Sequence, residues 1–204
     1  MNGTDWHNGA MVRAKIYVDV GWDHETRQAT TVSENEIRDD PDSLGGLREA
    51  ISPYSGDVDL DGRIGLHLSD GREFMGRDFH IEYVRHMLGL NETFCEKSSA
   101  QMRLNGQTHS LRASASGERI RLELVHRGSP MDSCDFPREE IVLEWFLAWA
   151  RFERVAYELG DVAAKELATT RFAQLCPEMQ IVVGEDRLMS VLNDPIGEVF
   201  GIDS

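Results

Sequence analysis

Three aspartates at alternate positions form the sharpest cluster of potential ligands in this sequence. Asp57, Asp59 and Asp61 precede Gly62, and Ile64 follows two residues later. Carboxylate oxygens are the ligands that hard divalent cations such as Ca²⁺ prefer in proteins. The spacing therefore predicts a site for Ca²⁺ or another divalent metal, and no other cofactor is suggested by the residues.

The aspartates match only part of a known calcium loop. They resemble the front half of an EF-hand loop, in which a glycine makes the turn and an apolar residue follows at loop position eight. Position twelve of such a loop is a bidentate glutamate, but counting from Asp57 places Leu68 there. The alternative interpretation is that Asp61 and Gly62 form a hairpin turn beside a solvated acidic stretch.

Four arginines form a second candidate site. Arg103, Arg112, Arg119 and Arg121 fall on one face of a meander predicted over residues 101–126. Like charges on neighbouring strands destabilise a sheet unless something neutralises them. The counter-charge is a loop or helix of the chain itself, an anionic ligand, or an acidic surface on another protein. Because arginine is enriched among interface anchors, we interpret the four as a docking face for a protein partner.

Histidines and cysteines give no catalytic motif. His80 and His86 are six residues apart, on opposite sides of a predicted helix, and no HExxH sequence occurs. Cys134 lies between His126 and Asp135 in the chain, but no glycine-rich elbow accompanies it. Phosphate-binding glycine loops are also absent from the sequence. Three widely spaced cysteines predict reduced thiols, and the sequence favours a non-enzymatic protein.

The charge is distributed unevenly along the 204 residues. Residues 1–62 carry 13 acids and 5 bases, residues 63–136 carry 10 of each, and residues 137–204 carry 13 acids and 6 bases. The formal net charge of −15 works against direct binding to nucleic acid or to an anionic membrane. The first ten residues have neither a basic nor an apolar region typical of a signal peptide, which predicts a cytoplasmic protein.

The elements that must position these residues are read from hydrophobic periodicity. Alternation predicts a strand at 12–22 and a hairpin of 63–68 with 72–75, before the meander at 101–126. Polar residues predict a mobile acidic loop near 23–42. Capping and apolar spacing predict helices at 44–51, 78–89, 138–159, 161–176 and 185–192.

Two turns set the register expected for the meander. Asn105 and Gly106 form a preferred two-residue turn, which places Met102 opposite His109. A second turn over 114–117 places Leu111 opposite Ile120 or Leu122, and both alternatives leave the same residues on each face. The predicted core face holds Met102, Leu104, His109, Leu111, Ile120, Leu122, Leu124 and His126. The opposite face holds the four arginines with Thr108, Ser110 and Glu123.

The helix at 138–159 is apolar over about two thirds of its circumference, which is wider than a surface helix needs. This width predicts a central core helix, or a core helix that also forms a homodimer interface. Charged residues interrupt it, so it does not read as a membrane span.

The sequence therefore predicts an α+β protein with one mostly antiparallel sheet of about six strands, packed on a long C-terminal helix and shorter helices. Residues 11–204 are expected to form one domain after a loose leader at 1–10. The leading functional hypothesis is an interaction protein of the immunity or inhibitor type, whose acidic loops engage a basic partner. The alternative is a divalent-metal-dependent enzyme or small-ligand-binding protein, with a site near Asp57, Asp59, Asp61 and His67.

Overall fold

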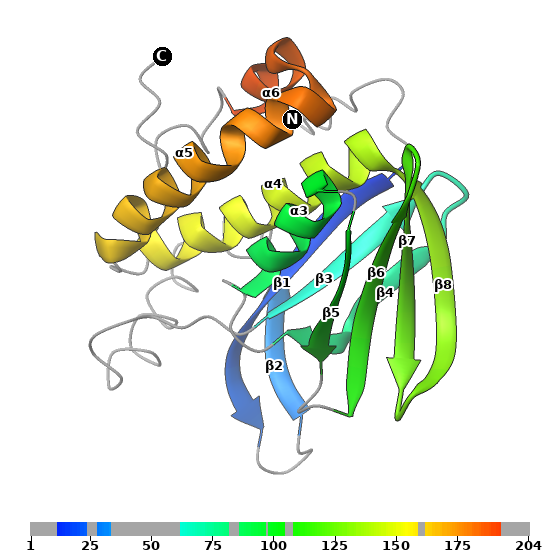
Figure 1. Cartoon of the computed structure of the whole chain (residues 1–204). Coiled ribbons are helices and arrows are strands. Elements are labelled where there is room, and N and C mark those ends of the chain that lie inside the picture. Colours follow the sequence, from blue (N-terminus) through cyan, green and yellow to red (C-terminus); the bar gives the residue numbers. More distant parts are fainter. Residues whose placement is uncertain are drawn as a thin grey trace.

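Two antiparallel sheets and a layer of helices make up the part of the chain that the structure describes (Figure 1). The computed structural model describes residues 12–23, 28–33, 62–81, 86–96, 98–104, 108–158 and 162–192. The first sheet has the order β2-β1-β3-β4 and the second the order β5-β6-β7-β8. The strands are β1 (Val12–Asp23), β2 (Gln28–Ser33), β3 (Gly62–Leu68), β4 (Glu73–Ile81), β5 (Ser99–Leu104), β6 (His109–Ser116), β7 (Arg119–His126) and β8 (Ser129–Pro137). The helices are α3 (Met87–Glu96), α4 (Arg138–Glu158), α5 (Val162–Val183) and α6 (Glu185–Leu192).

The α+β class is confirmed, but the single sheet of about six strands is wrong. Two of the eight described strands carry no clear sequence signal. Strand β2 lies within the polar segment 23–42 that was expected to be a loop. Strand β8 is exposed over most of its length and pairs only with β7, so it shows no alternation of apolar residues. The predicted leader at 1–10 and helix at 44–51 lie outside the described residues.

The meander has the predicted faces with a different register. Met102 lies opposite Leu111, and Leu111 lies opposite Leu124. The first connection is longer than a two-residue turn, because Leu104 pairs with His109. The second is a tight turn at Gly117 (φ 60°), later in the chain than expected. Both shifts are by an even number of residues, so the apolar side chains stay buried and the four arginines stay exposed. Ser110 differs: it is 7% exposed, opposite the buried Val125.

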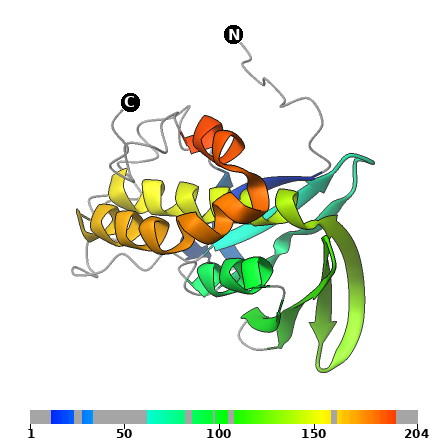
Figure 2. The same ribbon diagram turned by 45° about the horizontal axis from the view of Figure 1, so that its top comes forward.

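Helix α4 occupies the centre of the molecule, with α3, α5 and strand β1 packed against it (Figure 2). These contacts bury its wide apolar surface, including Trp145, Phe146 and Trp149, within one chain. The homodimer interface predicted for this helix therefore has no support from its apolar surface. Among the helices that the structure describes, none is long and apolar enough to cross a membrane.

Helix α4 has nearly the bounds predicted for the long helix, and α5 and α6 follow it as expected, but α5 is one residue longer, so α4 does not stand out as the long helix of the C-terminal part. The helix predicted at 161–176 was expected to end before Pro177, yet α5 continues through this proline to Val183. Proline removes one helical hydrogen bond. Leu175, Met179 and Val183 are buried on both sides of Pro177, and this burial outweighs the loss.

The helix predicted at 78–89 is also wrong. Strand β4 continues to Ile81, which is fully buried, and α3 begins only at Met87. Phe79 contacts the ring of His109 in the second sheet, with the ring centroids 5.7 Å apart. Gly89 consequently lies in the first turn of α3 instead of at a helix end.

Two side chains of α4 hold the backbone of β1. The N–H of Ala14 donates to Glu144 Oε2 at 3.0 Å, and Arg151 Nη1 donates to the Ala14 carbonyl oxygen at 2.9 Å. Ala14 pairs with Leu66 of β3 on its other side. The described pairing of β1 with β2 begins only at Tyr17. We call this pair of contacts the Ala14 clasp.

Candidate functional site

The arginine face is the exposed face of the second sheet that carries Arg103, Arg112, Arg119 and Arg121. Arg112 lies directly opposite Glu123 on β7, with Nη1 3.6 Å from Oε2. Its Nε also donates to Gln101 Oε1 on β5 at 3.4 Å. One carboxylate and one amide oxygen on the two neighbouring strands therefore hold this guanidinium in place.

Arg121 and Arg119 are held by the edge strand β8. Arg121 Nη1 lies 3.3 Å from Asp135 Oδ2, and its Nη2 donates to Ser133 Oγ at 2.8 Å. Arg119 Nη2 donates to the backbone carbonyl oxygen of Asp135 at 2.8 Å. Neighbouring strands thus supply part of the expected counter-charge, through Glu123 and Asp135. Arg103 is exposed and makes no hydrogen bond or ion pair with the residues that the structure describes.

A hollow of about 420 Å³ lies on this face, and Arg112, Arg121 and Glu123 line it together with Gln101 and Ser114. The side chains of Arg112 and Arg121 are 44% and 50% exposed. A guanidinium has five N–H donors, so each arginine keeps donors beyond those used within the sheet. The four arginines, together with the two carboxylates of Glu123 and Asp135, give this face a formal charge of +2 in a chain of net charge −15.

A second cluster surrounds the carboxylate of Glu73 on the first sheet. Glu73 Oε1 lies 3.3 Å from His67 Nε2 and accepts a hydrogen bond from the Tyr17 hydroxyl at 3.4 Å. The carboxylate lies against two glycines: a Cβ on Gly65 would overlap Oε1, and one on Gly76 would be 2.9 Å from Oε2. A side chain at either position would displace the Glu73 carboxylate from this arrangement. We call this cluster the Glu73 cradle.

The backbone at the cradle is unusual. Met75 has φ 69° and Gly76 has φ 86°, and the pairing of β3 with β4 shifts between Arg63 and Gly65. A positive φ at a residue with a long side chain is strained and is held by its surroundings. The carboxylate and imidazole are partly exposed, and a pair of this kind can bind a cation or exchange a proton. His67 was the only cradle residue that the sequence placed in a candidate site.

The predicted metal site cannot be placed, because Asp57, Asp59 and Asp61 lie outside the described residues. Gly62 begins strand β3, where a Cβ would be 2.5 Å from Phe152 Cε1 and 2.7 Å from the Tyr17 carbonyl oxygen. Close packing is thus a sufficient reason for glycine at this position. Within the described ranges, no three histidine, cysteine, aspartate or glutamate side chains form a group that could hold a metal.

The histidines and cysteines considered for catalysis are separated. His80 lies in β4 and His86 directly precedes α3. Cys134 lies opposite Leu122, whereas His126 pairs with Ser129, so about 13 Å of strand separates the two side chains. Burial raises the pKa of the Cys134 thiol, which disfavours the nucleophilic thiolate. All three cysteines are free thiols.

His109 and His126, expected on the core face, are half-buried and stack on each other. Their ring centroids are 4.5 Å apart and the ring planes differ by 16°. Burial lowers the pKa of His109, and the neighbouring His126 and Arg127 lower it further. This pair lies at the end of the second sheet and connects through Phe79 to the first.

Comparisons with known proteins gave no match to a family, to a curated protein or to a solved structure.

Proposed function

We propose that this protein is a non-enzymatic binding protein and that the arginine face docks an acidic patch of a protein partner. The observation that carries the proposal is the hollow of about 420 Å³ lined by Arg112 and Arg121. Both guanidinium groups are exposed at its wall and are already oriented by partners on neighbouring strands. Arginine side chains held in one geometry lose less conformational entropy when they bind a carboxylate.

The charge of the face supports an acidic partner. Its formal charge of +2 contrasts with the net charge of −15 of the whole chain. A positive face on a negative protein orients an acidic partner toward that face and repels it elsewhere, which favours docking in one orientation. Interfaces of this kind are anchored by a few arginine and aromatic residues.

The predicted binding of a basic partner by acidic loops is a separate part of this proposal. The acidic residues between 34 and 61 lie outside the described residues, so the proposal for them stays a prediction from charge alone. The immunity or inhibitor role likewise stays a hypothesis, based on size, acidity and α+β architecture.

Charge reversal on the arginine face tests the proposal. The double variant Arg112→Glu/Arg121→Glu removes both guanidinium groups from the hollow. The control Arg127→Glu/Arg187→Glu changes the net charge equally, and both of its sites are outside the lining of the hollow. Wild type and both variants are used as bait in native extract at low and high salt, and the bound proteins are identified by mass spectrometry.

We expect acidic proteins that are retained by wild type and by the control at low salt, lost at high salt, and lost from the arginine-face variant. Purified partner should then bind the arginine-face variant at least about tenfold more weakly, since an anchor contributes at least about 1.4 kcal/mol. Identical sets of bound proteins for the two variants would refute the docking face.

A further inference from the structure

A groove of about 490 Å³ lies between helices α3 and α5, on a part of the fold separate from the arginine face. Leu88 on α3, Leu167 on α5 and Trp149 on α4 lie around it. Leu167 is half-buried, whereas Leu88 is 6% exposed and Trp149 is fully buried, so Leu167 presents most of the apolar surface. Both outer helices pack against α4 (Figure 2). A volume of this size is in the range of sites for small molecules.

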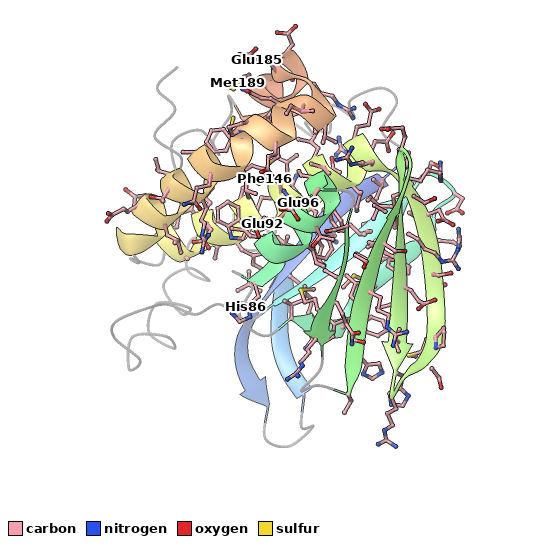
Figure 3. All side chains as sticks on the ribbon, in the orientation of Figure 1. His86, Glu92, Glu96, Phe146, Glu185 and Met189 are labelled. Carbon is pink, nitrogen blue, oxygen red and sulfur yellow. The ribbon has the colours of Figure 1, made fainter. Side chains whose placement is uncertain are left out.

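Opposite charges line the two sides of the groove. Glu92 follows Leu88 by one turn of α3, and Arg171 follows Leu167 by one turn of α5. In Figure 3, Glu92 lies between His86 and Glu96 along α3. Arg171 Nη1 donates to Gln174 Oε1 at 3.2 Å. No ion pair joins Arg171 to Glu92, nor does Glu92 hydrogen-bond to any residue that the structure describes.

Gly89 widens the groove on the α3 side. Its φ is not in the left-handed region, so the backbone does not require glycine there. A Cβ on Gly89 would meet no atom within 4 Å. Glycine in a helix is less favourable than alanine by about 1 kcal/mol. The open space beside it is therefore the structural consequence of having no side chain at this position.

We propose that this groove binds a small zwitterion with an apolar body, of the size of one or two amino acids. Glu92 is positioned for the ammonium group, Arg171 for the carboxylate, and Leu167 with the exposed edge of Leu88 for the apolar part. A ligand with only one of the two charges leaves the other side chain without a partner. The selectivity for both charges together distinguishes this site from a general apolar groove.

Calorimetric titration of the full chain with probes of defined charge tests the site. The zwitterionic probes are L-phenylalanine and L-leucyl-L-leucine. L-phenylalaninamide lacks the carboxylate, and 3-phenylpropanoate lacks the ammonium group. We expect at least one zwitterion to bind about two- to fivefold tighter than either singly charged analogue, in the range that an exposed ion pair contributes. No binding of either zwitterion up to about 10 mM, or equal binding of all probes, would overturn the proposal.

Three variants test which side chain binds each charge of the ligand and whether the ligand occupies the space beside Gly89. Arg171→Gln should reduce L-phenylalanine binding to the level of the amide, and Glu92→Gln should reduce it to that of 3-phenylpropanoate. Glu96→Gln and Arg187→Gln are controls outside the lining of the groove. Gly89→Leu fills the groove while improving helix propensity, so it should abolish binding without lowering the melting temperature. Retained binding in Gly89→Leu, or equal losses in the charge controls, would show that the probes bind elsewhere.

Discussion

Arg138 offers the sharpest test of how the helices are held together. This residue begins α4, and its side chain is directed to the last turn of α3. Nε donates to the Phe94 carbonyl oxygen at 2.7 Å, and Nη2 donates to the Cys95 carbonyl oxygen. Arg138 is only 7% exposed, so little water is available to replace these donors. A cation at the end of a helix is also favourable to the helix dipole.

The substitution Arg138→Met keeps the length of the side chain and removes every donor. A hydrogen bond from a charged group contributes about 1.5–3 kcal/mol, and the two bonds share one side chain. We therefore expect a loss of about 3 kcal/mol in the free energy of unfolding, which corresponds to a fall of about 6–12 °C in melting temperature for a chain of this length.

Urea unfolding measures this loss through the midpoint concentration at an unchanged m-value. Arg138→Lys keeps the charge and one donor group and should lose about half as much. The neighbouring Glu139 is exposed, so Glu139→Gln should change stability by less than about 0.5 kcal/mol and serves as the control. A loss below about 1 kcal/mol for Arg138→Met would refute the conclusion that Arg138 stabilises the end of α3.

Three further predictions concern other parts of the fold. Gly65→Ala should destabilise the protein by no more than about 1 kcal/mol, because its Cβ displaces the flexible and partly exposed Glu73 side chain from His67 and Tyr17; with Glu73→Ala already present the loss should vanish, and additive losses in thermal unfolding would contradict the cradle. Because burial lowers the pKa of His109, the unfolded chain takes up a proton first, and stability should fall as pH drops through about 6.5; an unchanged pH slope in His109→Gln would contradict this. Burial raises the pKa of Cys95 to about 11, so its alkylation rate, followed by mass spectrometry, should keep rising between about pH 8 and pH 10; a plateau near pH 8 would be inconsistent with that pKa.

Elements with a regular apolar pattern were predictable from the sequence. Strand β1 was expected at 12–22 and spans Val12–Asp23, and the last helix was expected at 185–192 and has those bounds. Alternation and 3.6-residue periodicity arise from burial on one side, so elements that bury one side show them. Among the described strands β8 pairs with β7 alone, and it is mostly exposed, which leaves no such pattern to detect.

Strand register and tertiary contacts were harder to predict from the sequence. Asn105 and Gly106 favour a two-residue turn locally, but the pairing of Leu104 with His109 sets a longer connection. The apolar side chains predicted on the core face nevertheless lie on that face of the sheet, because the buried side chains of each strand determine which face it turns to the core. Pro177 shows the same limit in a helix, since its local effect is outweighed by buried neighbours.

Of the two candidate sites, one was predictable from the sequence and the other was not. The arginine face was predictable because it depends only on alternation within neighbouring strands. The Glu73 cradle joins Tyr17, His67 and Glu73 from three strands, and no spacing in the chain indicates that they meet. Gly65 and Gly76 were the only available signal, and glycine alone does not say which side chain requires its space.

The Ala14 clasp has a consequence for the behaviour of the protein at high concentration. Exposed backbone donors and acceptors on a strand are a template on which a strand of another molecule can pair. Glu144 and Arg151 occupy one such donor and acceptor of β1, in the stretch before its described pairing with β2 begins. They do so with charged side chains that cannot themselves extend a sheet. A helix thus protects this strand edge against intermolecular β-pairing, and loss of the clasp would expose a route to aggregation before it disturbs the core.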